Sequence, residues 1–251
     1  MSRIRSLDFS PEIFSRIQIT YGSPEHSRLV ESMRECLPHI FSLVWPGRKY
    51  RETYDYLHAL YSQYPRQYHN VNHLARLFAE LTLRSKALHE ENSHYMKVTD
   101  PVIALSIFFH DAVYVPGSSI NELESNDLFD HLSQGVIFSP IKDIVTSNIL
   151  ATQDHTPIIK SREDSYWYFA QKLFLDLDLH FLGIPWEEFK KNRAEVAAEY
   201  PGVPEEAIRA GVVKFFSGFL KRKQIFYTKT FKMLYEEQAR SNMERLIKEC
   251  S

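Results

Sequence analysis

Two histidines, His69 and His73, stand four residues apart in the stretch QYHNVNHLARLF (67–78). The stretch is typical of the start of a helix, and a helix brings positions i and i+4 onto one face. Two imidazoles on one face can pack in a core. Alternatively, one of them can bind a metal while the other moves a proton.

A second pair, His110 and Asp111, ends the strongly apolar segment VIALSIFF (102–109). A helix that is apolar on all sides is typical of the middle of a protein. It would carry two ionisable groups into that interior, where an unpaired carboxylate is costly to bury. A divalent cation is one partner that accepts both an aspartate oxygen and a histidine nitrogen.

Two aspartates, Asp176 and Asp178, interrupt another apolar segment, LDLDLHFLG (175–183). Residues two apart in a helix point about 200° away from each other. Only one of these aspartates can therefore face a given site, and the other must cap, pair or reach solvent.

Together, His73, His110, Asp111 and one of these aspartates provide two imidazoles and two carboxylates on three separate helices. This donor set suits a divalent Mn, Ni, Fe, Zn or Mg ion, and the lack of thiolates argues against a structural zinc site. Four protein ligands on an octahedral ion leave two positions for water and substrate. That arrangement produces a hydroxide nucleophile near neutral pH.

The elements that would position these residues are helices. Eight glycines in 251 residues is a low count, and alternation of Val, Ile and Thr at period two is hard to find. Asp100 and Pro101 mark one helix start, and Ser139 and Pro140 mark another. Further helices are predicted over about 185–200, 204–222 and 230–248. Without repeats or long linkers, we predict a single all-α domain over 1–251.

Composition excludes several classes of function. The 30 Lys and Arg balance 32 Asp and Glu, so no overall field recruits nucleic acid or an anionic membrane. The N-terminus lacks the apolar segment of a secretory signal, and Cys36 and Cys250 form no disulfide framework. We therefore expect a cytoplasmic protein that binds neither nucleic acid nor membrane, and nothing in the sequence predicts an oligomeric state.

The order His…His-Asp…Asp resembles the HD superfamily of metal-dependent phosphohydrolases, most closely its poorly characterised branch of predicted HD phosphohydrolases. That branch carries the elements YHN..H, FHDAVY, NE..S, AT..H and D.DL..LG. The chain matches them at 68–73, 109–114, 121–125, 151–155 and 176–183, and its segment 225–242 is also similar. The resemblance covers roughly residues 50–245, which leaves 1–49 as an N-terminal helical extension.

The resemblance implies an HD-type helical bundle with one divalent metal, bound by His73, His110, Asp111 and Asp178. It favours Asp178 over Asp176 because the last ligand of the superfamily stands in an Ala-Asp-x-Leu-like context. A second metal is the less favoured alternative.

The YHN..H element is also similar to one in the cyclic-nucleotide phosphodiesterases, where the second histidine binds metal and the first protonates the leaving group. By that analogy His69 is the general acid, one helical turn from the ligand His73. Tyr114 stands where those enzymes have a further histidine, so cyclic nucleotides are not implied.

Other residues of these elements have more than one interpretation. Glu122 could orient the attacking water, or it could simply begin a helix together with Asn121. His155 could contact phosphate or bind a second metal, and Asn70 is expected to contact substrate.

The sequence therefore predicts a metal-dependent phosphohydrolase that cleaves a phosphoester of a small molecule, with a nucleotide or related metabolite favoured. The alternatives are an HD-type diiron oxygenase, which needs a second iron and more histidines, and a non-catalytic nucleotide-binding HD domain. The stretch 207–235 carries seven Lys and Arg and no acid. It is either a solvated face or a rim that steers a phosphorylated substrate.

Overall fold

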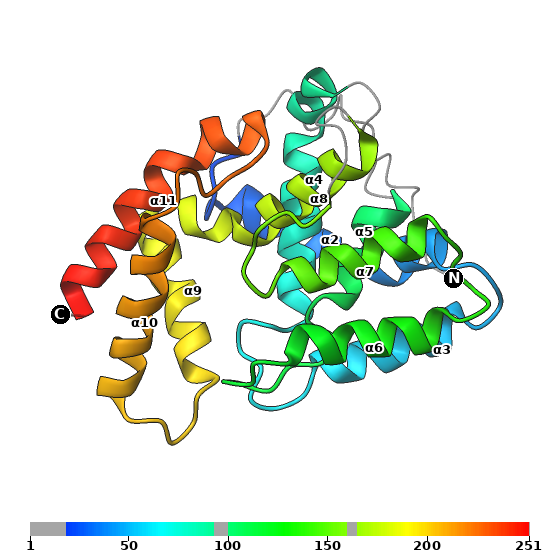
Figure 1. Cartoon of the computed structure of the whole chain (residues 1–251), viewed down its shortest axis with the longest axis horizontal. Helices are drawn as coiled ribbons and strands as arrows, with labels where there is room; N and C mark the ends of the chain where they lie inside the picture. The colour runs from blue at the N-terminus through cyan, green and yellow to red at the C-terminus, as the bar shows by residue number, and fades with distance from the viewer. Residues whose placement is uncertain (1–18, 93–99, 160–164, 251) are drawn as a thin grey trace.

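The computed structural model describes residues 19–92, 100–159 and 165–250 (Figure 1). Within these ranges the chain forms ten α-helices, one short 3-10 helix and no strand, which confirms the all-α prediction. The helices are α2 (Pro24–Val44), α3 (Tyr50–Tyr61), α4 (Val71–Glu91), α5 (Pro101–Phe109), α6 (Asn121–Ser133), α7 (Ile141–Ala151), α8 (Tyr166–Leu179), η1 (His180–Gly183), α9 (Trp186–Ala198), α10 (Glu205–Leu220) and α11 (Lys229–Cys250). None of these described helices combines the length and the apolar character that crossing a membrane requires.

Helix α5 lies in the interior of the bundle, as its sequence predicts. It contacts α2, α4, α6, α7 and α8, and every residue of 102–109 is buried. Its start is also the predicted one, because an Asp100 carboxylate oxygen accepts from the backbone N–H groups of Val102 and Ile103 at 3.1 and 3.3 Å. The buried helix then ends at His110-Asp111, which places this pair inside the protein.

The bundle has one continuous core. Buried apolar side chains from Leu29 to Met243 form a single cluster. Helix α2 belongs to it, since Leu37 and Phe41 are fully buried and α2 packs against α4 and α5. The described part of the expected N-terminal extension is thus an integral layer of the bundle.

Two helices begin later than the sequence predicts. Helix α7 begins at Ile141, with Pro140 rather than Ser139 in the N-cap position. Helix α4 begins at Val71 because Asn70 has an extended backbone and its side-chain oxygen accepts from Asn72 N at 2.8 Å. His69 therefore lies in the loop before α4, and the prediction that His69 and His73 share a helical face is wrong.

The segment 175–183 holds α11 against the rest of the bundle. The Asp176 carboxylate accepts from the backbone N–H groups of Tyr227 and Thr228 at 2.8 and 2.7 Å, just before α11 begins. At Gly183 the backbone passes so close to α11 that a Cβ atom would lie 2.5 Å from Tyr235 Cβ and 2.6 Å from its carbonyl oxygen. A glycine is therefore required where η1 meets α11.

We predict that Gly183→Ala lowers the free energy of unfolding by about 1–3 kcal/mol, because η1 and α11 must move apart to admit the methyl group. Gly218→Ala in α10 is the matched control, since a Cβ there meets nothing within 4 Å. Urea denaturation of both variants tests this. Equal stability of the two variants would contradict the close approach.

Candidate functional site

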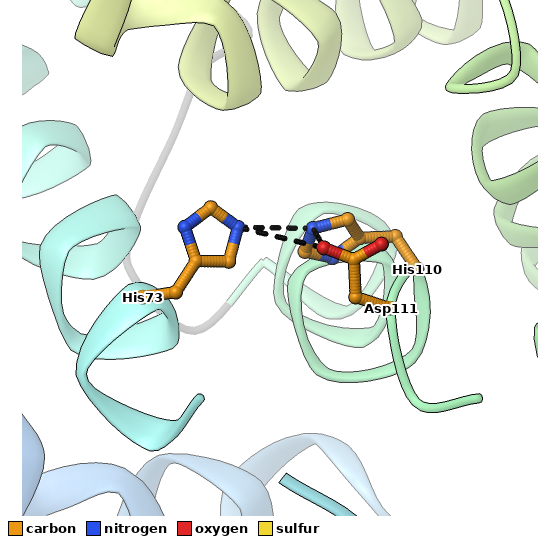
Figure 2. A group of neighbouring side chains, drawn as sticks. All are labelled: His73, His110 and Asp111. Carbon is orange, nitrogen blue, oxygen red and sulfur yellow. Dashed lines mark hydrogen bonds and ion pairs between the residues drawn. The ribbon is translucent and has the colours of Figure 1, made fainter. Parts of the chain in front are cut away.

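Three side chains that could bind a metal meet inside the bundle (Figure 2). His73 comes from α4, whereas His110 and Asp111 follow α5. His110 Nε2 lies 3.1 Å from His73 Nε2 and 3.1 Å from Asp111 Oδ2. One ligand atom from each residue lies within 4.8 Å of the others.

Asp178 of α8 adds a second carboxylate to this cluster. Its Oδ1 lies 3.4 Å from His73 Nε2 and 3.5 Å from His110 Nε2. Neighbouring ligands of an octahedral ion with bonds near 2.1 Å are about 3.0 Å apart. The spacing of these nitrogen and oxygen atoms is thus close to what one divalent ion requires. Asp176 lies outside the cluster, because its carboxylate accepts from the backbone of Tyr227 and Thr228 before α11.

The charges in the cluster also suit a cation. Burial alone would raise the pKa of Asp111 and of Asp178, but the charge of His110 and its hydrogen bonds hold both well below their usual range. Burial would lower the pKa of His110, yet the two carboxylates raise it well above 6.5. Burial lowers the pKa of His73 to about 4, so this ring is neutral and can donate a lone pair. The cluster therefore favours a positive charge between its carboxylates.

Contacts around the cluster fix its orientation. His110 Nδ1 lies 3.0 Å from the Ile107 carbonyl oxygen, so Nδ1–H donates there and Nε2 faces the cluster. The buried Arg66 guanidinium donates to the carbonyl oxygens of Asp111 and Ala112 at 2.6 and 2.9 Å. It also donates to the His69 carbonyl at 3.0 Å. Arg66 thus ties the loop before α4 to the His110-Asp111 turn.

His69 is held by a residue that the sequence did not point to, Glu199, at the end of α9. Glu199 Oε2 lies 2.6 Å from His69 Nδ1 and accepts from Tyr114 OH at 2.8 Å. Glu199 Oε1 accepts from three successive backbone N–H groups, those of Gln67, Tyr68 and His69, at 2.7–2.8 Å. This carboxylate fixes both the loop and the His69 ring.

These hydrogen bonds keep Glu199 ionised. Burial would raise its pKa, but the hydrogen bonds from the His69 ring and from the backbone lower it to about 2. The sequence carries one signal that could have drawn attention to Glu199. An acid at the C-terminal end of a helix opposes the helix dipole, so it needs another reason to be there.

His155 contacts the far oxygen of Asp178. Its Nε2 lies 2.9 Å from Asp178 Oδ2. Its backbone is in the left-handed region (φ 51°), which is uncommon for a residue with a side chain. Tyr227 OH and Arg222 both donate to the His155 carbonyl, at 2.9 and 3.3 Å, and hold it there. His155 is therefore placed to orient Asp178.

A cleft of about 540 Å³ opens beside the cluster. His69, Asp111, His155 and Asp178 line it, and so does Glu122 of α6. The neighbours of Glu122 in the NE..S element hold the preceding loop. Asn121 bonds both backbone groups of Val115, and Ser125 Oγ bonds both backbone groups of Val113.

Asn70 lies outside this cleft. Its amide nitrogen donates to the Gln67 carbonyl at 2.6 Å, and its oxygen caps α4. With His58 and Arg66 it lines a separate depression. The structure therefore gives Asn70 the role of a helix cap in place of the expected contact with substrate.

The site thus combines a potential cation site, a hydrogen-bonded histidine and carboxylate pair, and an open cleft that reaches both. Such a combination can place a polarised water and a proton donor on the same bound ester. Neither the protein-family models nor the curated proteins against which the chain was compared give a match.

We predict that Asp178→Asn removes metal binding, whereas Asp176→Asn retains it and lowers stability through the lost contacts to Tyr227 and Thr228. A divalent metal at about 100 times its Kd stabilises by about 2.7 kcal/mol, which for a chain of this length raises Tm by about 5–10 °C. Thermal unfolding with and without Mn²⁺ or Ni²⁺ measures both effects. A metal-dependent rise in Asp178→Asn equal to that of the wild type would exclude Asp178 as a ligand.

Proposed function

We propose that this chain is an HD-type metal-dependent phosphohydrolase that cleaves a phosphoester of a small molecule. The observation that carries the proposal is the meeting of two histidines and two aspartates from α4, the end of α5 and α8, with both aspartates lining an open cleft. The motifs shared with the HD superfamily support the same reaction. We further propose one divalent ion as the cofactor, held by His73, His110, Asp111 and Asp178.

A divalent ion held by these four residues would lower the pKa of water and polarise a phosphoryl oxygen. The chain's own residues prepare the site for it. Asp111 and Asp178 stay ionised, and His110 is fixed through Ile107 so that its Nε2 faces them. His155 contacts the Asp178 carboxylate and holds it in place. Arg66 donates to the Asp111 carbonyl and fixes the backbone there.

His69 would supply the proton for the leaving group. With Nδ1 hydrogen-bonded to Glu199, Nε2 is the nitrogen that can exchange a proton with a substrate in the cleft. The Glu199 carboxylate, 2.6 Å from Nδ1, accepts from this nitrogen and so leaves Nε2 to carry the proton of a general acid. In the reaction the water oxygen bonds to phosphorus, the ester P–O bond breaks, and the departing oxygen takes the proton from His69. The proton lost by the water restores His69.

The reaction is tested by measuring phosphate release from a panel of small phosphoesters, with Mn²⁺, Ni²⁺, Mg²⁺, Zn²⁺ or Fe²⁺ added. We expect metal-dependent turnover by the wild type and none above background by His110→Ala, because that variant loses a ligand at the centre of the cluster. Turnover by His110→Ala equal to that of the wild type would assign the activity to a contaminant. No release from any ester with any metal would overturn the proposed function.

His69→Ala should lower kcat by about 10²–10⁴, the usual contribution of a positioned general acid, and should keep the metal content of the wild type. Glu199→Gln should lower kcat by about 10–100 with little change in KM, because the ring keeps its place in the cleft but loses its ionised partner. His73→Ala should lose the metal. Elemental analysis and steady-state kinetics separate these effects. If His69→Ala also loses the metal, His69 is a ligand and the proposed division of roles is wrong.

A further inference from the structure

Helix α10 and the turn that joins it to α9 form one wall of the cleft. Tyr200 lines this wall at the start of the turn, and the other six residues of the wall are small or apolar: Val203, Ala207, Ile208, Gly211, Val212 and Phe215. Two of the large ones are unusually exposed for apolar side chains, Phe215 at 48% and Val203 at 41%. An exposed apolar surface that continues from a polar site is typical of a binding surface.

Several polar side chains of the cleft are already hydrogen-bonded within the protein. Tyr114 OH donates to Glu199, Thr152 donates to the Ile149 carbonyl, and Gln153 donates to the Ser119 carbonyl. Both amide atoms of Asn121 are bonded to the Val115 backbone. A site that recognises a sugar or a base needs polar groups that are not already hydrogen-bonded within the protein. In these four side chains the named atoms are already used within the protein, whereas Glu122 and Tyr200 also line the cleft.

Positive charge in the cleft is scarce. Of the described residues that line it, Arg193 alone is an arginine or lysine, and its guanidinium lies 5.2 Å from the ring centre of Phe216. The basic stretch 207–235 does not change this. Arg209 pairs with Glu205 at 2.9 Å on the helix surface, and Arg222 donates to backbone carbonyls. Binding of a polyphosphate typically uses several cationic groups.

We propose that the substrate is an ester of a single phosphate with an apolar alkyl or aryl group, and that this group packs on the α10 wall. The inference rests on the proposed function, because it places the phosphate at the Asp111–Asp178 end of the cleft. The apolar group then extends toward Ala207 and Gly211. Hydrolysis releases inorganic phosphate and an apolar alcohol, and nucleoside polyphosphates are poor substrates.

The space for the apolar group comes from two small residues one helical turn apart, Ala207 and Gly211. A Cβ atom built at Gly211 meets nothing within 4 Å, so a larger side chain there fits without moving the backbone and narrows the cleft. Gly218 lies two turns further along the same helix, is equally open, and does not line the cleft. The pair offers a matched comparison within one helix.

The first experiment compares ethyl, butyl and hexyl phosphate with AMP and ATP, using the metal-loaded protein. We expect kcat/KM to rise about fourfold for each methylene that reaches the wall, and hexyl phosphate to exceed ATP. Calorimetric affinities of ethylphosphonate and hexylphosphonate, which cannot be hydrolysed at a P–O ester bond, give a readout that does not depend on turnover. They should show the same dependence on chain length.

The second experiment uses Gly211→Leu and Gly218→Leu, with circular dichroism to verify that both are folded. Gly211→Leu should lower the ratio of hexyl to ethyl phosphate kcat/KM at least tenfold. Gly218→Leu should keep the wild-type ratio. Equal ratios in the two variants would show that the apolar group does not lie against Gly211 and would overturn the inference.

The outcomes separate this inference from the proposed function. Hydrolysis without dependence on chain length, or a preference for ATP, overturns the apolar substrate and leaves the phosphohydrolase intact. Phosphonate affinity that rises with chain length without hydrolysis of any ester overturns the phosphohydrolase and supports the apolar ligand. If the protein hydrolyses no ester and its phosphonate affinity does not rise with chain length, both the phosphohydrolase and the apolar ligand are overturned.

Discussion

Burial of ionised groups is the constraint on which the architecture of this protein depends. Asp111 and Asp178 remain ionised although their side chains are only 19% and 13% exposed, and an isolated carboxylate is costly to bury. Each lies within reach of His73 and His110, and these four residues come from α4, from the turn that ends α5 and from α8. The helices α4, α5 and α8 must therefore keep their mutual positions, and the apolar contacts of α5 with its neighbours hold them there.

A further carboxylate, the buried Glu199, joins the two sides of the cleft. Its five hydrogen bonds reach three backbone groups of the loop before α4, the His69 ring and Tyr114 OH. Glu199 also ends α9, the helix that precedes the apolar wall on α10. The position of His69, the proposed proton donor, is thereby linked to the position of the apolar wall on α10. A change in the α9–α10 turn is expected to reach His69 through this one side chain.

The two aspartates of α8 show how one short segment serves both the site and the fold. Asp178 faces the cluster and His155, whereas Asp176 accepts hydrogen bonds from the residues that precede α11. Burial outweighs those hydrogen bonds and raises the pKa of Asp176 to about 7, in contrast to the lowered pKa of Asp178. Two residues of the same type, two positions apart in one helix, differ because only Asp178 has the charge of His110 beside it.

The sequence by itself determined the all-α class, the burial of α5 and the start of that helix at Asp100, because apolar periodicity and helix caps are local properties. It also pointed to His73, His110, Asp111 and Asp178, which the structure brings together. Only the tertiary structure decided the placement of His69 in a loop, the capping role of Asn70, and the roles of Glu199 and Arg66. The hydrogen bonds of Glu199 join residues about 130 positions apart. Contacts between such distant residues leave no periodicity or spacing in the chain, since they form only when the helices have packed.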